Sequence, residues 1–491
     1  MTRDLLKDPA WAAEELGQPL PESVHAVSVA LPRWQDVIDY EEKSPEVVNR
    51  LQCGYPRFVI HPLVTRMALT LGGGQPCLPF PSDRAAEEAT DFVREQGAPA
   101  ELVRLRGICG VTTDKTGIAA LKAFWQHTGL IVSSRQAEAW LEDRAEDADA
   151  ASLCASLRRQ LAGFYDCAED DVFLAPTGMA AQFEALKAVQ QRRPGQATVQ
   201  LGFPYVDTLK LQQKLGHGGE LLHDLKCIGA ELRQLVARRI PAACFGEIPG
   251  NPLLGSPDVR EVTPILREHG IPFVADDVVA TPLNVDLSNH ADLIATSLTK
   301  YVVGSCDAMG GALICNPRSP YHEELKALVR VQHEELLWGA DARVLDHQAH
   351  TFPERMRRHN INGLLIAERL RAHPAVERVW YPKWEFSEAY EAVRRPAGGW
   401  GSLVTFLPRR AEESSPRIYD RLHISKGPSL GTMFTLACPF TLLAHYTELT
   451  WAEACGVSRF LIRVSVGLED PEELWQRFES ALNEAGSIRA A

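Results

Sequence analysis

The middle of the chain alternates short apolar runs with longer amphipathic stretches. Between about residues 150 and 320, β-branched runs bounded by Gly, Pro and Asp are followed by segments with apolar residues at three-to-four spacing. The runs that predict strands are VFLAP, ATVQLGF, AACFGEI, IPFVADDV, DLIATSL and GGALICN. This alternation predicts an α/β fold, with a large mixed or mostly parallel sheet and helices on both of its faces.

The flanking regions follow other patterns. Residues 1–65 mix short apolar pieces with prolines, and we expect them to form an arm that packs on something else. Gly/Pro-rich loops and helical stretches such as AAEEATDFVREQ predict an extra, mainly helical segment over residues 66–150, within a large domain spanning 66–345. That segment could narrow an entrance, contact a partner chain or cover the core. A long helical stretch and the runs VERVWYP, SLVTFLP and FLIRVSVG predict a smaller α+β domain over 346–491.

Composition narrows the function classes. The 491 residues are 45% hydrophobic and 23% charged, which excludes disordered and fibrous classes. A net charge of −13 gives no basic surface for nucleic acid or an anionic membrane, so we expect small-molecule partners. The 11 cysteines contain no C-x-x-C, which suits reduced thiols and a cytoplasmic location. No apolar stretch approaches the length of a membrane span.

Ligands of open α/β sheets bind beyond the carboxyl ends of the strands. The predicted strands there end in Thr177-Gly178-Met179, Pro204-Tyr205, Pro249-Gly250-Asn251-Pro252, Asp276-Asp277 and Ser297-Leu298-Thr299-Lys300. A glycine turn before a helix suits a phosphate, an aromatic ring can stack on a heterocycle, and a buried carboxylate requires a cationic partner. Together with the lysine and hydroxyls, these are the groups that pyridoxal 5′-phosphate (PLP) requires.

Several motifs resemble a known family. The stretches SLTKYVVGSCDAMGGALICNP, FGEIPGNPLL, APTGMAA and LIRVSVGLEDPEEL resemble the Cys/Met-metabolism PLP enzymes, which include cystathionine γ-synthases, cystathionine lyases and O-acylhomoserine sulfhydrylases. The pieces GYPRFVIH, GFPYVDTLK and KGPSLGTMFTLACPFTLLAHYTEL are similar to the fungal-type cystathionine γ-synthase branch. The resemblance extends over residues 27–475 and implies a PLP-dependent transferase of fold type I.

The resemblance also implies residue roles. Lys300 would be the Schiff-base lysine and general base, and Asp276 would hold the pyridine nitrogen. Tyr205 would stack on the ring and also act in proton transfer, if nearby cations lower its pKa. Gly178, Met179, Ser297 and Thr299 would bind the cofactor's phosphate, and Tyr55 and Arg57 of a neighbouring subunit's arm would complete that phosphate site. Asn251 would be a further cofactor contact.

The substrate contacts follow from the same resemblance. Arg463, helped by Ser429, would bind the substrate α-carboxylate. Lys210 would replace an arginine of the common bacterial enzymes near the leaving group, or it is a solvated helix lysine. Two departures stand near the ring: Val206-Asp207 follow Tyr205 where those enzymes have small residues, and Asp277-Val278 replace the family's Asn and Thr.

The implied activity is a γ-replacement of the EC 2.5.1 class, in the transsulfuration steps of amino-acid biosynthesis. An O-succinyl-, O-acetyl- or O-phosphohomoserine would react with L-cysteine to give cystathionine, in a homo-oligomer of dimers with shared sites, usually a tetramer. Four alternatives stay open: an O-acylhomoserine sulfhydrylase, a cystathionine or methionine γ- or β-lyase, a γ-substitution with a non-thiol nucleophile, and a catalytically inactive scaffold.

Two other signals are weaker. Residues 427–431 fit the serine-hydrolase pattern G-x-S-x-G, but Pro428 precedes the serine and no strand–turn–helix surrounds it. His347 and His350 lie three residues apart on an expected helix without an accompanying ligand set, so no metal site is expected.

Overall fold

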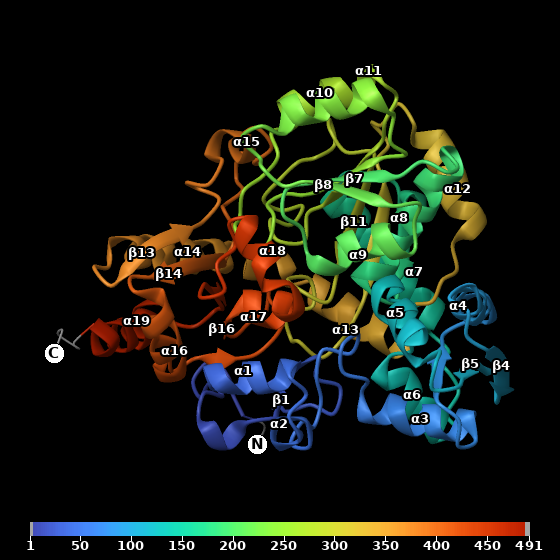
Figure 1. Cartoon of the computed structure of the whole chain (residues 1–491), viewed down its shortest axis with the longest axis horizontal. Helices are drawn as coiled ribbons and strands as arrows, with labels where there is room; N and C mark the ends of the chain where they lie inside the picture. Colours follow the sequence, from blue (N-terminus) through green and yellow to red (C-terminus); the bar gives the residue numbers. More distant parts are fainter. Residues whose placement is uncertain (1–2, 487–491) are drawn as a thin grey trace.

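The computed structural model describes residues 3–486, so the ends of the predicted arm and C-terminal domain, 1–2 and 487–491, lie outside the described residues. In Figure 1 the arm lies at the bottom in blue and the following segment at the lower right in cyan. The large sheet occupies the centre, and the C-terminal part projects to the left in orange and red. No helix of the described part is both long and apolar enough to cross a membrane.

A seven-stranded mixed sheet forms the large domain, as predicted. Its strands are β6 (Val172–Ala175), β7 (Thr198–Leu201), β8 (Gly219–Leu222), β9 (Cys244–Glu247), β10 (Phe273–Asp276), β11 (Leu293–Ser297) and β12 (Gly311–Cys315). The order is β6-β12-β11-β10-β9-β7-β8, with parallel pairing from β8 to β11 and β12 antiparallel to both of its neighbours. All six predicted strands are present, and β8 is an additional one.

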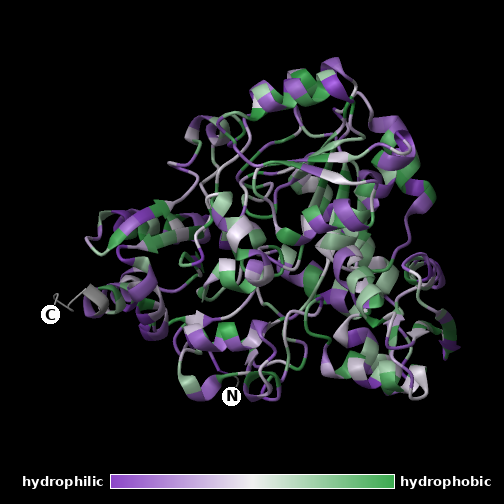
Figure 2. Ribbon diagram, in the orientation of Figure 1, coloured by the Kyte–Doolittle hydropathy of each residue, from purple (hydrophilic) through white to green (hydrophobic). Residues whose placement is uncertain are grey.

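Amphipathic helices connect these strands. They are α7 (Ala150–Tyr165), α8 (Gly178–Arg192), α9 (Val206–Lys214), α10 (Ile228–Arg238), α11 (Val259–Glu268), α12 (His322–Gln332) and α13 (Gly339–Ala349). Helices such as α10 and α11 show green and purple bands in Figure 2, the mixture expected of helices with one buried face. Helix α8 is buried along most of its length and packs on β11 and β12, so it places its first turn at the strands' carboxyl ends.

The C-terminal part has the predicted α+β character. Its sheet order is β13-β14-β17-β16-β15, formed by β13 (Val376–Trp380), β14 (Leu403–Pro408), β15 (Ser425–Lys426), β16 (Leu436–Cys438) and β17 (Ile462–Ser465). The helices are α14 (Phe352–Ala372), α15 (Ser387–Glu391), α16 (Ala411–Arg421), α17 (Phe440–His445), α18 (Leu449–Ala454) and α19 (Pro471–Gly486).

The arm packs on the C-terminal part of its own chain. It contains β1 (Pro19–Leu20), β2 (Ser28–Val29), α1 (Trp34–Glu41) and α2 (Pro45–Val48). The fully buried Lys426 binds the arm through two hydrogen bonds. Leu31 N donates to the Lys426 carbonyl, and Lys426 Nζ donates to the Pro32 carbonyl at 2.9 Å. Burial lowers the pKa of Lys426 to about 7.

The segment over residues 66–150 has the expected helices and loops and, in addition, a small sheet that the sequence analysis did not predict. It contains an antiparallel sheet of β3 (Cys77–Phe80), β5 (Ile108–Thr113) and β4 (Ala100–Leu105) beside α3 (Pro62–Gly72), α4 (Asp83–Glu95), α5 (Ile118–Thr128) and α6 (Ser134–Leu141). Arg106 and Gly107 both have positive φ, as a two-residue hairpin loop between β4 and β5 requires. The run ELVRLRGICGVTT carries that hairpin signal.

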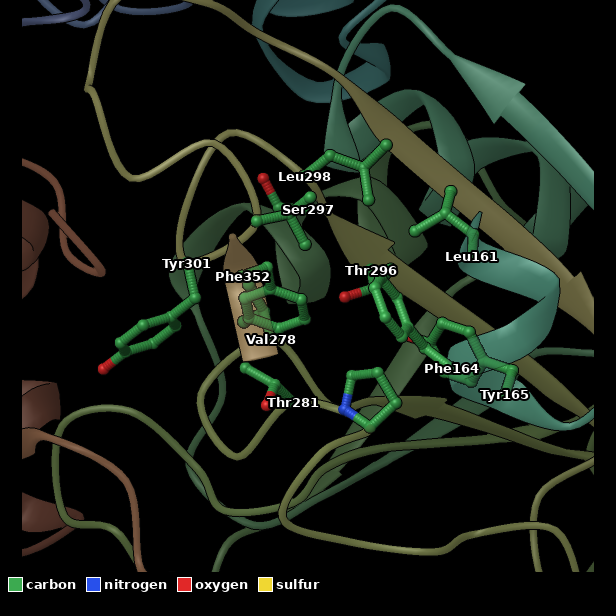
Figure 3. A pocket seen from close by; sticks show the side chains of 12 residues that line it. Leu161, Phe164, Tyr165, Val278, Thr281, Thr296, Ser297, Leu298, Tyr301 and Phe352 are labelled. Carbon is green, nitrogen blue, oxygen red and sulfur yellow. The ribbon is translucent and has the colours of Figure 1, made fainter. Parts of the chain in front are cut away.

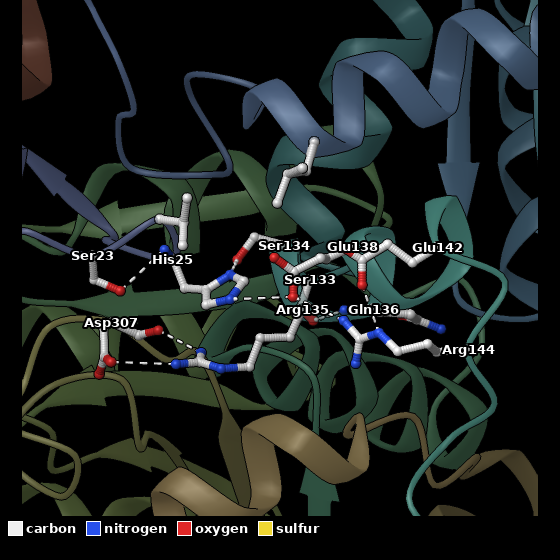
Figure 4. Close-up of polar contacts among 12 residues, drawn as sticks. Ser23, His25, Ser133, Ser134, Arg135, Gln136, Glu138, Glu142, Arg144 and Asp307 are labelled. Atoms are coloured by element: carbon white, nitrogen blue, oxygen red, sulfur yellow. Dashed lines mark hydrogen bonds and ion pairs between the residues drawn. The ribbon is translucent and has the colours of Figure 1, made fainter.

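Ion pairs join this segment to the large domain. Arg135 donates through Nη2 to Asp307 Oδ2 at 3.2 Å and through Nη1 to Asp341 Oδ1 at 3.0 Å. Figure 4 shows Arg135 reaching Asp307, and beside it Arg144 paired with Glu138 on the same segment. Asp341 is buried, so Arg135 compensates a charge that would otherwise be costly.

We therefore expect Arg135→Gln to lower the free energy of unfolding by about 2–4 kcal/mol, since it leaves a buried carboxylate unpaired. Urea denaturation measures the change. Arg144→Gln is the matched control, because Arg144 is 53% exposed and its loss should cost no more than about 1 kcal/mol. Equal losses in the two variants would contradict this role of Arg135.

Candidate active site

One cavity of about 640 Å³ opens at the carboxyl ends of β9, β10 and β11. All but one of the residues predicted for the site line it: Tyr55, Arg57, Gly178, Met179, Tyr205, Lys210, Asn251, Asp276, Ser297, Lys300, Ser429 and Arg463. Thr299 is the exception. Its hydroxyl is buried against Gly310, and its phosphate contact stays a prediction.

Lys300 lies three residues beyond β11 and is held from two sides. Its Nζ donates to Ser429 Oγ at 3.0 Å and lies 4.3 Å from the centroid of the Tyr55 ring. Ser429 has φ of 100°, a left-handed conformation that is unfavourable for serine and that the surrounding loop imposes. The loop therefore holds Ser429 in a strained backbone conformation, which places its hydroxyl next to the Lys300 amine.

Asp276 ends β10 as a half-buried carboxylate at the wall of the cavity. Its oxygens accept hydrogen bonds from Gln182 Nε2 at 3.0 Å and from Val278 N at 2.9 Å. Burial, with the adjacent Asp277, raises the pKa of Asp276 to about 7. Among residues 3–486 no ion-pair partner contacts Asp276, so the cation that the sequence analysis requires has to come from a ligand.

Asp277 lies behind this carboxylate. The Tyr165 hydroxyl is 3.1 and 3.0 Å from the two Asp277 oxygens and donates to the carboxylate. Burial raises the pKa of Asp277 to about 6, and the Tyr165 hydrogen bond opposes that rise. The departure at position 277 therefore places a second ionisable group next to Asp276.

The first turn of α8 forms an anion cradle. Thr177 caps the helix by accepting a hydrogen bond from Ala180 N at 3.1 Å. A Cβ on Gly178 would lie 2.6 Å from Ser297 Cβ, so only glycine permits this approach of α8 to the end of β11. Backbone N–H groups and the Ser297 hydroxyl meet there, as binding of a phosphate requires.

The two phenols of the site differ in the direction of their pKa shifts. Burial raises the pKa of Tyr205 well above its ordinary value, and Arg57, which donates to its hydroxyl, only partly opposes this. The condition set for Tyr205 in proton transfer, a pKa lowered by nearby cations, is therefore not met in this structure. Burial acts on Tyr55 too, but Lys300 and Arg57 together outweigh it and lower the pKa of Tyr55.

Arg463 is oriented by the end of β9 and by the Ser429 loop. Its Nη1 donates to Asn251 Oδ1 at 3.2 Å and its Nη2 to the Ser429 carbonyl at 2.7 Å. Asn251 N in turn donates to Glu247 Oε2 at 3.0 Å. Glu469 accepts hydrogen bonds from Thr435 instead, so Arg463 faces the cavity as a cation suited to a carboxylate.

Lys210 lines the cavity but already has a carboxylate partner. Its Nζ lies 2.6 Å from Glu448 Oε2, and His445 Nδ1 contacts the other oxygen of Glu448 at 3.1 Å. Its predicted contact with the leaving group therefore stays a prediction, since this pair would have to open first.

Sequence reasoning missed several polar residues around the cavity, among them Gln126, His127, Asp207 and Glu247. Asp207 and Glu247 carried local signals, because Asp207 stands at a noted departure and Glu247 ends β9. Gln126 and His127 lie on α5 of the inserted segment, and no pattern connects them to the sheet edge.

A smaller cavity lies behind Ser297. It is lined by side chains that include Tyr165, Val278 and Phe352, and Figure 3 shows these side chains facing it. Its volume of about 10 Å³ suffices for one water molecule at most. This smaller cavity therefore cannot accept a substrate or a cofactor.

The residues present fit PLP. A buried carboxylate without a described cation suits a ring N–H⁺, Lys300 suits the carbonyl carbon, and the glycine cradle suits the phosphate. Gln182 supports the fit, because its Oε1 is buried without a hydrogen-bond partner in the described chain while its Nε2 binds Asp276. Within residues 3–486, no group of three or more His, Cys, Asp or Glu side chains could hold a metal ion.

Comparisons with known proteins agree with this chemistry. A family model described as Cys/Met metabolism PLP-dependent enzyme matches residues 154–483, and one described as fungal trans-sulfuration enzyme, N-terminal domain, matches residues 59–133. Cystathionine gamma-synthase of Neurospora crassa is 32% identical, over 96% of this chain and 98% of its own. An L-2-amino-4-chloropent-4-enoate dechlorinase/desaturase of Streptantibioticus cattleyicolor is 34% identical, over 96% and 98%.

A solved structure shows the same fold. Cystathionine gamma synthase from Xanthomonas oryzae pv. oryzae, in complex with cystathionine, superposes with a TM-score of 0.59 at 28% identity. The match covers 67% of this chain and 84% of that one. The fold class predicted from the sequence, fold type I with a mixed α/β sheet, is thereby confirmed.

The raised pKa of Asp276 makes the stability of the cofactor-free protein depend on pH. Because about 7 lies above the ordinary value of about 3.9, the stabilising effect is complete below about pH 4 and is lost as pH rises through 7. We expect Asp276→Asn to raise the Tm of the cofactor-free protein at pH 8 and to change it much less at pH 4.5. Gln182 can rotate its unpaired Oε1 toward the new amide.

Thermal melts at the two pH values measure this difference. Asp91→Asn is the control, because Asp91 is 73% exposed and its replacement should act alike at both pH values. A Tm of Asp276→Asn below that of the wild type at pH 8 would show that the buried charge is compensated within the chain.

Proposed function

Because the chain belongs to the family of Cys/Met-metabolism PLP-dependent enzymes, we propose that it replaces the γ-substituent of an O-activated homoserine with the sulfur of L-cysteine, giving cystathionine. The observation that carries this proposal is the placement of Lys300, Asp276 and Arg463 around one cavity. An amine, a ring-nitrogen partner and a carboxylate clamp are what an amino-acid substrate needs there.

The side chains that would hold the cofactor match its reactive and charged groups. Lys300 would hold it covalently, Asp276 would balance its ring nitrogen, and Gly178 with Ser297 would hold its phosphate. When bound, PLP accepts the electron pair that the substrate carbon releases on losing its proton. Asp276 supports this, because an ionised carboxylate keeps the ring nitrogen protonated.

Arg463 and Lys300 act on the substrate itself. The guanidinium of Arg463 is fixed by Asn251 and the Ser429 carbonyl, so it can clamp the α-carboxylate without reorganising. This clamp turns the α-hydrogen toward Lys300 Nζ, which takes it as a proton and later returns it. Ser429 Oγ, 3.0 Å from Nζ, keeps the amine in place.

In the replacement, one bond at Cγ breaks and another forms. The γ-oxygen substituent leaves with the electron pair of the C–O bond, as a carboxylate or a phosphate. The sulfur of cysteine forms the new C–S bond after its thiol proton is removed, and Lys300 Nζ moves the protons at Cα and Cβ. The products are cystathionine and the released acid.

One observation favours a second candidate, γ-elimination. The relative of Streptantibioticus cattleyicolor, 34% identical over nearly the whole chain, is named a dechlorinase/desaturase. An enzyme of this second type would release its γ-substituent without adding cysteine.

Product analysis tests the proposal. We expect purified protein with PLP to form cystathionine from one of O-succinyl-, O-acetyl- or O-phosphohomoserine only when L-cysteine is present, as measured by mass spectrometry. Lys300→Ala should lower the rate by at least about 10³-fold, because the proton carrier is lost. Formation of 2-oxobutanoate and ammonia alone would assign elimination, and no reaction with any donor would refute both candidates.

The position of the N-terminal arm bears on whether the active site is shared between two subunits. The sequence predicts that Tyr55 and Arg57 complete a neighbouring subunit's site, whereas in the described chain they lie at the chain's own site. The shared-site dimer therefore stays a proposal. It predicts that inactive Arg57→Ala and Lys300→Ala chains, when co-expressed, recover about a quarter of wild-type turnover, because half of randomly mixed dimers hold one intact site.

Each variant expressed alone is the control for this mixture. If no turnover returns when the two chains are shown to associate, each arm serves its own chain, and the shared-site proposal fails.

A further inference from the structure

A fully buried carboxylate stands beside the cavity and has no role in the proposed chemistry. Asp207, the second residue of α9, is 0% exposed, and the side chains that contact it come from two distant parts of the chain. Its Oδ2 pairs with Arg57 of the arm. Its Oδ1 accepts from Gln126 Nε2 at 2.9 Å and lies 3.1 Å from His127 Nδ1, both on α5.

These contacts keep Asp207 charged. Burial would raise the pKa of its carboxyl, but the charge of Arg57 and the hydrogen bond from His127 hold the pKa below its ordinary range. A buried anion of this kind is costly to form and is stable only where its partners are in place. Asp207 therefore requires both the arm and α5 at this position.

Arg57 is in turn restrained on every side. Its Nη1 donates to the Gln126 carbonyl at 2.7 Å as well as to Asp207, and its Nη2 donates to the Tyr205 hydroxyl. The guanidinium carbon lies 5.5, 5.1 and 5.6 Å from the ring centroids of Tyr55, Phe58 and Tyr205. Asp207 is the only carboxylate among these described partners, so it supplies the charge that holds the guanidinium at the cavity wall.

We propose that Asp207 is the residue that positions Arg57 at the cofactor site, and that Gln126 and His127 of α5 fix Asp207 in turn. The inserted segment is then part of the site, because its helix α5 sets where the arm's cation stands. The inference rests on the proposed role of Arg57 in holding the cofactor's phosphate, and it does not depend on which substrate reacts.

A double-mutant cycle on cofactor binding tests this arrangement. PLP is titrated into cofactor-free wild type, Arg57→Ala, Asp207→Asn and the double variant, and the Kd is read from the visible absorption of the bound cofactor. We expect Asp207→Asn to raise the Kd at least about tenfold in the wild type and less than about twofold when Arg57 is absent. With pyridoxal, which has no phosphate, the variant should change the Kd less than about twofold.

Asp292→Asn is the matched control. Asp292 is also buried and paired with an arginine, Arg267, but it lies at the opposite end of β11. It should lose comparable stability and leave the PLP Kd unchanged. A second variant, His127→Leu, keeps the Arg57–Asp207 pair and should weaken PLP binding about two- to fivefold, with no such effect in Arg57→Ala.

Three outcomes would overturn the proposal. They are an unchanged PLP Kd in Asp207→Asn, effects of Arg57→Ala and Asp207→Asn that simply add, and an equal loss for PLP and pyridoxal. If Asp207→Asn does not fold, the same criteria apply to His127→Leu. Failure of cystathionine formation would leave the cycle unaffected, because it measures binding of the cofactor alone.

Discussion

Two successive carboxylates at the end of β10 require positive charge beside them, and the rest of the site is arranged around that requirement. Loss of solvation raises the pKa of both Asp276 and Asp277, and the charge of Asp277 adds to the rise at Asp276. Tyr165 donates to Asp277, and Asp276 likewise receives only neutral donors. The charge of Asp276 is thus left for a bound cation, and the sheet edge is arranged to admit one.

Three cations at the cavity are held in place by other residues of the chain and not by the substrate. Lys300 rests on Ser429, Arg463 rests on Asn251, and Arg57 rests on Asp207. Such fixation costs free energy when the protein folds but removes the need to reorganise when ligands bind. The strained φ of Ser429 is one place where that cost is visible.

Strands and their terminal residues could be predicted because the signal is local. A β-branched run followed by Asp276 or by Lys300 is readable within ten residues. Contacts across the fold were not readable: Arg57 and Asp207 are 150 positions apart, and His127 reaches the site only through the packing of α5. The direction of the Tyr205 pKa shift likewise depends on a balance of burial and charge that no motif encodes. The hairpin loop at Arg106, in contrast, does have a local signal in the sequence, which the sequence analysis overlooked.

One short stretch of the inserted segment, residues 126–135, makes buried polar contacts with the large domain: Arg135 of α6 pairs with Asp341, and Gln126 and His127 of α5 contact Asp207. Buried ion pairs add little net stability compared with apolar packing, but they tolerate only one geometry. An insertion that merely covered a core would need apolar contacts alone. The use of charge at these contacts therefore indicates that the orientation of this segment matters, and one polar site that its orientation affects is the one holding Arg57.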